Sequence, residues 1–299
     1  MLLRHVRYFL AVVEHRNFTR AAEALHVSQP TLSQQIRQLE DSLGAQLLDR
    51  SARTIQLTDA GVVYAEFAKR ALRDLDDGKR AIHDVRELTR GTLRLAITPT
   101  FTAYLVGPLL EKYHRRYPGL TISVNEMPQD RMEAMLNDDT LDAGIAFHET
   151  QLPEIEAHAL FSEELALMVG KSHALARKGT RLDIGKFAET PLVLLNDSFV
   201  TRQWIDRYCR QQGVIPRVAI EVNSINAVMA IVQRSTLATL LPAPIAQEHS
   251  QLRIVGLEPA LPQRTAALLM RKGAYRSAAT EAFVELVREE FDVAGTRRR

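Results

Sequence analysis

The chain has 299 residues, of which 46% are hydrophobic and 25% are charged. This length and composition predict two or three globular domains with cores of their own. The net charge of +2 excludes a polycation that would bind nucleic acid by bulk charge alone. Cys209 is the only cysteine, so an intrachain disulfide and a multi-cysteine metal site are both excluded.

Two kinds of targeting segment are missing from this sequence. The first residues lack the apolar run and small-residue cleavage site of a signal peptide. No stretch reaches the length of about 18 apolar residues that a membrane-spanning helix needs. We therefore expect a cytoplasmic protein in a reducing setting, with no membrane partner.

The first 43 residues contain three helical patterns. A repeated apolar face over residues 3–13 predicts a first helix. Residues 18–25 and 29–43 predict two further helices, joined by a tight turn at His26 and Val27. The first helix can then pack behind this pair and complete a small helical core.

The third pattern has an apolar face and a polar face. Ser28 stands where its helix needs an N-cap, and Pro30 lies in the first turn, where a missing N–H is tolerated. The apolar stripe, with spacings of 4, 3 and 4, comprises Leu32, Ile36, Leu39 and Leu43. The opposite face carries side chains suited to base edges or phosphates: Gln29, Thr31, Ser33, Gln34, Arg37 and Gln38. These features predict a helix-turn-helix from Phe18 to Arg37 whose second helix reads DNA.

The alternative reading is a small helical bundle with a merely solvated polar face. Surface helices more often carry Glu and Lys, whereas this face has no acidic residue before Glu40. That composition favours the DNA-reading interpretation.

Two short strands are predicted after the helices. Residues 47–50 and 54–57 flank residues 51–53, an arrangement typical of a wing with Arg50 and Arg53 at its tip. Both arginines suit phosphate or minor-groove contacts. Residues 1–58 hold seven arginines, no lysine and five acidic residues, a net charge of only +2. DNA affinity therefore requires placed arginines and the pairing of two such units.

A long helix is predicted from Asp59, capped by Thr58, to about Leu88. Thirty helical residues span about 45 Å. Its apolar or small residues are spaced alternately by 4 and 3, which predicts a dimerisation seam of Tyr64, Ala68, Ala71, Leu75, Gly78, Ile82 and Val85. The alternative is a long helix that lies on its own domain. We favour dimerisation, because a two-fold pair of recognition helices needs a spacer to reach two half-sites.

From residue 91 the sequence alternates between strands and helices. Strands are predicted at 93–97, 120–124, 141–147, 165–169, 192–195, 218–222, 238–241 and 265–270. Helices are predicted at 100–116, 129–137, 200–212, 224–235 and 277–291. This order predicts two α/β halves, each built on a parallel sheet covered by helices.

Polar residues follow several of the predicted strands. They stand at 98–102, 127–129, 147–148, 196–198, 201–202 and 223–224. Ligands of open parallel sheets bind outside the carboxyl ends of strands, often at helix N-termini. Thr and Asn at strand ends are also common turn-formers and caps, which leaves the ligand role of each residue open. Their occurrence in both halves predicts a clamshell for a small ligand.

Several runs of this sequence resemble the LysR-type transcriptional regulators. They are FTRAA at 18–22, LHVSQPTLSQQIRQLE at 25–40, LLDR at 47–50, LTDAG at 57–61 and LLP at 240–242. The resemblance covers nearly the whole chain. Within the family, RAIHDV at 80–85, LAITPTFT at 95–102 and SINAV at 224–228 are similar to regulators of cyanate-degradation operons. One departure is STLAT at 235–239, where the family commonly has glycines.

The resemblance implies a fold of three parts. These are a winged helix-turn-helix over 1–58, a dimerising linker helix over 59–90 and a periplasmic-binding-protein-like α/β effector domain over 91–293. Subdomain I of the effector domain would comprise 91–161 and 266–293, and subdomain II would comprise 162–265. Residues 294–299 are expected to be a disordered tail.

The resemblance also implies functional residues and partners. The DNA-binding positions are Gln29, Thr31, Ser33, Gln34, Arg37, Arg50 and Arg53. The effector-binding positions are Thr98, Thr100, Phe101, Gln129, Phe147, Asn196, Thr201 and Asn223. The implied partners are double-stranded promoter DNA, RNA polymerase, further copies of the chain in a dimer of dimers, and a small effector such as cyanate or another small anion. Such a regulator would activate an adjacent operon and repress its own gene.

An enzyme on the same α/β scaffold is the chief rival from another class. The sequence contains no Gly-rich dinucleotide or phosphate loop, no nucleophile elbow and no zinc-protease motif. The nine histidines are scattered without metal-ligand spacing. We therefore expect no catalytic residue, metal or cofactor. A solute-binding protein and a purely architectural DNA binder are further alternatives; the first lacks a reason for the DNA-reading head, and the second leaves most of the chain unused.

Overall fold

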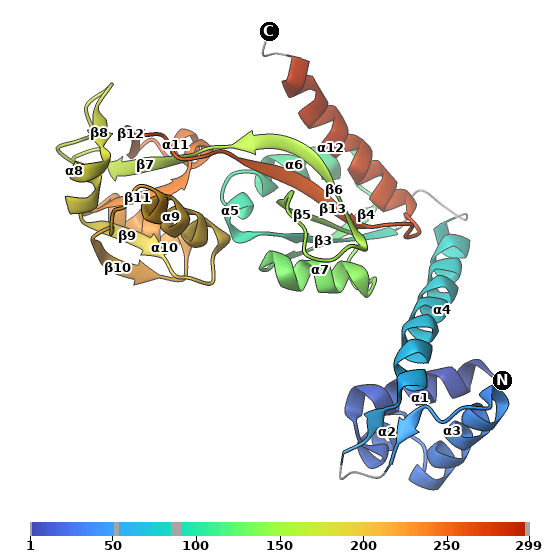
Figure 1. Ribbon diagram of the computed structural model, residues 1–299. Helices are drawn as coiled ribbons and strands as arrows, with labels where there is room; N and C mark the ends of the chain where they lie inside the picture. Colours follow the sequence, from blue (N-terminus) through green and yellow to red (C-terminus); the bar gives the residue numbers. More distant parts are fainter. Residues whose placement is uncertain (1, 51–53, 85–90, 297–299) are drawn as a thin grey trace. The chain divides into compact units, whose positions relative to one another are not determined.

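Figure 1 shows a computed structural model of the chain, which describes residues 2–50, 54–84 and 91–296. The predictions made for Arg53, for Val85 and for residues 297–299 lie outside the described residues, as does the side chain of Ile82. The chain divides into two compact units, Met1–Ile82 and His83–Arg299, and each is described by itself.

The N-terminal unit begins with the three predicted helices: α1 (Leu3–His15), α2 (Phe18–Ala24) and α3 (Gln29–Leu43). Asn17 caps α2 by accepting a hydrogen bond from the Arg20 N–H at 3.1 Å. Ser28 caps α3 as predicted, with 3.3 Å between its Oγ and the Thr31 nitrogen. The buried stripe of α3 packs against α1 and α2 in a core that includes Phe9, Val12, Ala21, Leu32, Ile36 and Leu39.

The wing strands β1 (Leu48–Asp49) and β2 (Gln56–Leu57) pair antiparallel, with Leu48 opposite Leu57. Helix α4 (Asp59–Asp84) follows directly, and the predicted Thr58 cap is confirmed, because the Gly61 N–H donates to Thr58 Oγ1 at 3.0 Å. The same hydroxyl donates to the Gln46 carbonyl at 2.6 Å. The wing and the start of α4 are therefore joined by one threonine.

Part of the predicted dimerisation seam on α4 packs within its own unit. The ring of Tyr64 lies 5.5 Å from that of Phe9, and Ala68 is only 5% exposed. The seam was derived from spacing alone, which does not reveal that the first turns of α4 cover α1. The large exposed apolar residues of the described part of α4 are Val62, Val63, Phe67 and Leu75.

The C-terminal unit contains two sheets. The five-stranded sheet has the order β4 (Leu120–Glu126), β3 (Gly91–Ile97), β5 (Ala143–Phe147), β13 (Arg264–Arg271) and β6 (Ile155–Glu163). The six-stranded sheet has the order β10 (Val218–Val222), β9 (Leu192–Leu195), β11 (Ala238–Pro242), β7 (Leu165–Gly170), β12 (Leu252–Glu258) and β8 (Arg181–Asp183). The chain passes from the first sheet to the second between β6 and β7, and returns between β12 and β13.

Both sheets are mixed, which corrects the prediction of parallel sheets. Strands β4, β3 and β5 are parallel, whereas β13 runs antiparallel to both β5 and β6. In the other sheet β7 runs antiparallel to β11 and β12. The antiparallel pairs arise where the chain crosses between the sheets, and neither β6 nor β12 was predicted. The helix predicted over 100–116 is divided into α5 (Pro99–Thr102) and α6 (Val106–Arg116).

Helices cover both faces of each sheet (Figure 1). On the five-stranded sheet, α6 and α12 (Ala278–Thr296) lie on one face and α7 (Gln129–Asn137) on the other. On the six-stranded sheet, α8 (Ile184–Glu189) and α9 (Val200–Gln211) lie opposite α10 (Ile225–Val232) and α11 (Ala243–Glu248). This alternation follows from the period of two along each strand.

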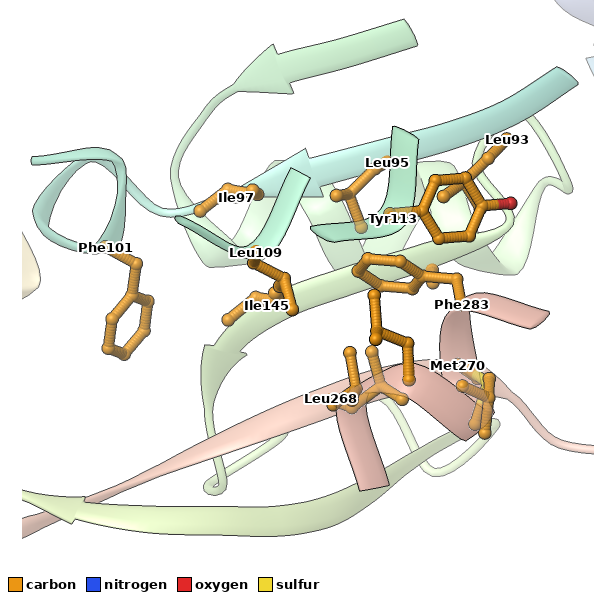
Figure 2. Close-up of a cluster of buried hydrophobic side chains, with 14 of the residues drawn as sticks. Leu93, Leu95, Ile97, Phe101, Leu109, Tyr113, Ile145, Leu268, Met270 and Phe283 are labelled. Atoms are coloured by element: carbon orange, nitrogen blue, oxygen red, sulfur yellow. The ribbon is translucent and has the colours of Figure 1, made fainter. Parts of the chain in front are cut away.

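Figure 2 shows the core beneath α6 and α12, where Tyr113 and Phe283 meet between the two helices and strand β3. Their ring centroids are 5.7 Å apart, and Tyr113 donates its hydroxyl to the Ala279 carbonyl at 2.8 Å. Burial raises the pKa of the Tyr113 phenol above its usual value. Complete burial of such an aromatic ring contributes roughly 2 kcal/mol. This core packs α6 and α12 against the first sheet.

Candidate functional site

The exposed face of α3 presents most of the predicted DNA-binding residues to solvent. Gln29, Thr31, Gln34 and Arg37 are exposed, and Ser33 is half-buried. The Thr31 hydroxyl lies 2.8 Å from Ser28 Oγ, so it takes part in the N-cap of its own helix. The first turn of α3 contains no acidic residue, which leaves the positive end of the helix dipole available to a phosphate.

Arg50 has a structural role that the sequence did not indicate. Its Nη2 lies 2.8 Å from Glu40 Oε2, and its guanidinium lies 5.3 Å from the centre of the Phe18 ring. Glu40 Oε1 also accepts the backbone N–H groups of Leu47 and Leu48, at 2.9 and 3.2 Å. The pair therefore attaches the wing to α3, and Glu40 reduces the charge that Arg50 can offer to a phosphate.

A cavity of about 270 Å³ lies at the strand ends of the C-terminal unit. Five of the predicted effector positions line it: Thr98, Thr100, Phe147, Thr201 and Asn223. Thr98, Thr100 and Phe147 lie at the ends of strands of the five-stranded sheet. Thr201 and Asn223 come from the half of the unit that holds the six-stranded sheet, as the clamshell prediction requires. A second hollow of about 710 Å³ is also lined by Gln129, Trp204 and Arg207. The two hollows share four lining residues, Pro128, Phe147, Ser198 and Val200.

The polar groups of the smaller cavity carry little charge. Its lining includes Glu126 but no lysine or arginine. Within the described part of the chain, the buried Thr98 Oγ1 has no hydrogen-bond partner, although Thr98 is only 3% exposed. Helices α7 and α9 begin at the cavity wall without side-chain caps. The cavity therefore offers a hydroxyl and helix N–H groups to a ligand.

Two predicted effector positions do not line either hollow. Phe101 is fully buried in the core of the first sheet, with its ring centroid 5.1 Å from that of Phe147. Asn196 accepts a hydrogen bond from Ser198 Oγ at 2.6 Å and so stabilises the turn before α9. Strand-end position alone therefore does not bring a side chain to a hollow, because a turn also directs side chains into the core or into hydrogen bonds within the turn.

Gln129 lines the larger hollow, but its amide is already engaged. Its Nε2 contacts Glu133 Oε1 at 2.9 Å and the carbonyls of Phe147 and Glu149 at 3.0 and 2.7 Å. Its Oε1 accepts the Phe147 N–H at 3.0 Å. Gln129 therefore holds the end of β5 against α7, and its remaining capacity for a ligand is small.

A buried pair of opposite charges lies where the chain crosses between the sheets. Arg264 and Glu163 are register partners on β13 and β6 and form an ion pair through Nε and Oε2. Tyr104 donates its hydroxyl to Glu163 Oε1 at 2.5 Å, and Arg264 Nη2 donates to Thr201 Oγ1 at 3.0 Å. Phe147 lies under the guanidinium, with 4.1 Å between Arg264 Cζ and the ring centroid.

This cluster escaped the sequence analysis because its hydrogen-bonded partners are separated by 59, 63 and 101 positions along the chain. Burial lowers the pKa of Arg264, and burial together with Glu163 raises the pKa of Tyr104. The hydroxyl of Thr201 is occupied by Arg264, so this predicted effector residue reaches the cavity with reduced hydrogen-bonding capacity.

Cys209 lies on α9 and is 2% exposed. Burial, with a smaller contribution from Asp206, raises the pKa of its thiol to about 11. Because thiolate is the reactive form, we expect a thiol reagent near pH 8 to modify the native chain about a hundredfold more slowly than the urea-unfolded chain. Rates from a colorimetric thiol assay check this. Equal rates in the two states would contradict the burial of the thiol.

Among the described residues, no helix is both long and apolar enough to cross a membrane. Within the same ranges, no group of three or more His, Cys, Asp or Glu side chains is placed to hold a metal ion.

A winged helix-turn-helix followed by a two-sheet ligand-binding unit defines a class of bacterial regulators, and known proteins place the chain within it. The profile of the LysR substrate binding domain matches residues 86–292. The profile of the bacterial regulatory helix-turn-helix protein, lysR family, matches residues 3–62. The chain therefore belongs to the LysR family of DNA-binding transcriptional regulators.

Individual relatives cover nearly the whole chain. A hydrogen peroxide-inducible genes activator of Pectobacterium carotovorum is 32% identical over 295 residues, which are 97% of this chain and 96% of that protein. A RuBisCO operon transcriptional regulator of Allochromatium vinosum is 28% identical over 96% of both proteins. The crystal structure of full-length CbnR complexed with its target DNA matches with a TM-score of 0.57 and 26% identity, covering 97% of this chain and 99% of that one.

Proposed function

We propose that this regulator binds promoter DNA as an oligomer and that a small effector in the cavity of about 270 Å³ controls its action on an adjacent operon. The observation that carries this proposal concerns Thr98, a residue of the cavity lining whose buried hydroxyl has no protein partner in the described chain. A buried hydroxyl without a hydrogen bond is unfavourable by about 1–3 kcal/mol. An effector that accepts or donates a hydrogen bond there would recover that energy.

The DNA-reading surface of the proposal is the exposed face of α3. It comprises Gln29, Thr31, Ser33, Gln34 and Arg37, with Arg50 in a secondary role because Glu40 pairs with it. CbnR, the relative solved with its target DNA, supports the same use of this unit. Arg53 keeps its proposed phosphate contact on sequence grounds alone. Because DNA is the partner, we place the protein in the cytoplasm.

Pairing of two chains is supported by an apolar surface at the start of α4. A shallow hollow there is lined by Asp59 and by seven apolar or aromatic residues: Leu43, Ala45, Leu47, Ala60, Val63, Tyr64 and Phe67. Val63 and Phe67 are 56% and 59% exposed, which is unusual for large apolar side chains that remain in water. We therefore propose dimerisation through this surface together with Ala71 and Leu75. A dimer of dimers and a contact with RNA polymerase are proposed from the family alone.

The chemistry of the cavity supports a small effector of low charge or a small anion. Hydroxyls and helix N–H groups bind such ligands without a full countercharge. Arg202, which lies near the cavity, is occupied by Asp206 and Glu221 at 2.9 and 2.7 Å. Cyanate fits this chemistry and remains a proposal, and none of the relatives named above is a cyanate regulator. A different small metabolite is the alternative.

The Pectobacterium relative is named for a response to hydrogen peroxide. Such a response in this chain could not use an intrachain disulfide. The chain has one cysteine, and its thiol is buried with a raised pKa. An intrachain disulfide switch is therefore excluded. We accordingly propose that effector binding, and not oxidation of the cysteine, regulates the protein. Activation of the neighbouring operon together with repression of its own gene is the mode we propose.

The Thr98→Val change tests the cavity. The change removes the hydroxyl and keeps the shape of the side chain. We therefore expect the apparent affinity of the full chain for its effector, measured by thermal stabilisation, to fall by at least about tenfold. Potassium cyanate, sodium bicarbonate and a panel of small carboxylates are the probes, with duplex DNA binding measured in parallel.

Thr239→Val is the matched control, because the Thr239 hydroxyl is also buried without a partner among the described residues but does not line the cavity. Retained stabilisation in Thr98→Val would show that the effector binds elsewhere. If no probe stabilises the wild-type chain but DNA binding persists, these probes are excluded as effectors.

A further inference from the structure

We propose that the effector is an amino acid with a small side chain, whose carboxylate binds at the first turn of α9 and whose ammonium group pairs with Glu126. The inference rests on the proposed function, because it names the class of ligand for the cavity of about 270 Å³. It favours the small-metabolite alternative over cyanate. It also adds Glu126, which the sequence did not single out, to the residues of that cavity.

Glu126 is the one charged residue in the described lining of the cavity. It is the last residue of strand β4 in the five-stranded sheet, and it is exposed. Within the described ranges of the chain, its carboxylate forms no hydrogen bond or ion pair. The cavity therefore has a negative pole that no protein cation neutralises.

The first turn of α9 supplies the opposite pole. The lining includes Phe199, Val200 and Thr201, where α9 begins without a side-chain cap and without an acidic residue. The first N–H groups of a helix have no partner within it, and the helix dipole places roughly half a positive charge there. A ligand carboxylate accepts hydrogen bonds from such groups. Helix α7 also begins at this wall, but Asp130 in its first turn offsets the dipole.

A buried hydroxyl points to a ligand in this cavity independently of the helix. Thr98 lines the cavity and is only 3% exposed, and its Oγ1 has no partner in the part of the chain that the structure describes. A hydroxyl both donates and accepts hydrogen bonds, so it suits either end of a ligand with two opposite charges.

The balance of charges distinguishes between classes of ligand. Roughly half a positive charge at α9 is set against one full negative charge on Glu126. Arg202 does not change this balance, because Asp206 and Glu221 pair with it. A simple anion would leave Glu126 unmatched, and a simple amine would leave the N–H groups of α9 without an acceptor. A zwitterion satisfies both poles and brings no net charge.

The two poles belong to different halves of the C-terminal unit. Glu126 ends a strand of the five-stranded sheet, whereas α9 follows β9 of the six-stranded sheet. The cavity volume of about 270 Å³ lies just below the range of roughly 300–1,000 Å³ that is typical of pockets for drug-sized ligands. The ligand is therefore small, and its two charges link the two halves.

Thermal unfolding of the full-length chain in the presence of each standard amino acid tests the class of ligand. Propionate, which lacks the ammonium group, and ethylamine, which lacks the carboxylate, are the matched probes. We expect an amino acid with a small side chain to bind at least about tenfold more tightly than either probe, because each probe loses hydrogen bonds to one charged group.

The Glu126→Gln change locates the ammonium group. It keeps the size of the side chain and removes its charge. The affinity for the amino acid should fall about three- to fivefold, the scale of an exposed ion pair, while the affinity for propionate should not fall. Glu149→Gln is the matched control, because Glu149 is also exposed but lines only the larger hollow. We expect this control to leave both affinities unchanged.

Three results would overturn the inference. Stabilisation by propionate or ethylamine as strong as that by every amino acid would exclude a zwitterion. An amino-acid affinity that Glu126→Gln leaves unchanged would exclude Glu126 as the partner of the ammonium group. Failure of every amino acid to stabilise the chain would exclude the class. The proposed function is decided separately, by whether Thr98→Val weakens the binding of whichever probe stabilises the wild-type chain.

Discussion

Glu163→Gln is expected to lower the free energy of unfolding of the C-terminal unit by about 3 kcal/mol, because it leaves the Arg264 guanidinium buried without its countercharge. The two side chains are 0% and 1% exposed, so water cannot replace the lost partner. Trp204 is the single tryptophan and lies in this unit. Urea unfolding followed by its fluorescence therefore reports the C-terminal unit alone.

A second ion pair that involves strand β6 supplies the control. Glu156 pairs with Arg276 at 2.9 Å, but both side chains are about 30% exposed, so Glu156→Gln is expected to change stability by less than about 1 kcal/mol. The double change Glu163→Gln with Arg264→Met removes the orphaned charge and should be less destabilising than Glu163→Gln alone. If Glu163→Gln is no more harmful than Glu156→Gln, the ion pair does not stabilise the crossover.

Gly61→Ala is expected to destabilise the N-terminal unit by about 3 kcal/mol, whereas Gly78→Ala in the same helix should stabilise it by about 1 kcal/mol. A Cβ on Gly61 would lie 2.0 Å from the Leu47 carbonyl oxygen, which is backbone and cannot move aside cheaply. A Cβ on Gly78 would meet nothing within 4 Å. At this position no clash offsets the higher helix propensity of alanine over glycine.

Both glycines lie in α4, so helix propensity predicts the same gain for each and only the contact with Leu47 separates them. Far-UV circular dichroism during thermal unfolding measures the effect on this largely helical unit. The Trp204 fluorescence transition should stay unchanged in both variants, because it reports the other unit. Equal effects of the two changes would contradict the close approach of α4 to the wing.

Local chemistry made the helix-turn-helix predictable. The cap at Ser28, the tolerated Pro30 and the period of the apolar stripe act within a few residues of one another, and α3 begins and ends where that pattern does. Strands with alternating or continuous apolar character were predicted for the same reason, and β9 and β10 match their predicted ranges. Strand β6 (Ile155–Glu163) was not predicted, although it is the longest strand of its sheet.

The cavity was only partly predictable. Parallel strands place their carboxyl ends at one edge of each sheet, and strand ends from both sheets bring Thr98, Thr100 and Asn223 to the same cavity. The direction of each side chain depends on turn geometry and on neighbours from distant segments. Phe101 consequently lies in the core, and the amide of Gln129 links α7 to β5 by a hydrogen bond.

The sequence by itself determined the family, the DNA-reading helix and the succession of α/β elements, because these depend on interactions between residues close together in the chain. Only the tertiary structure decided which charges remain available. It paired Glu40 with Arg50 and Glu163 with Arg264, and it directed Tyr64 and Ala68 of the predicted seam onto their own unit. Partners of this kind lie far apart in sequence, and their choice follows from packing and desolvation, which no local pattern records.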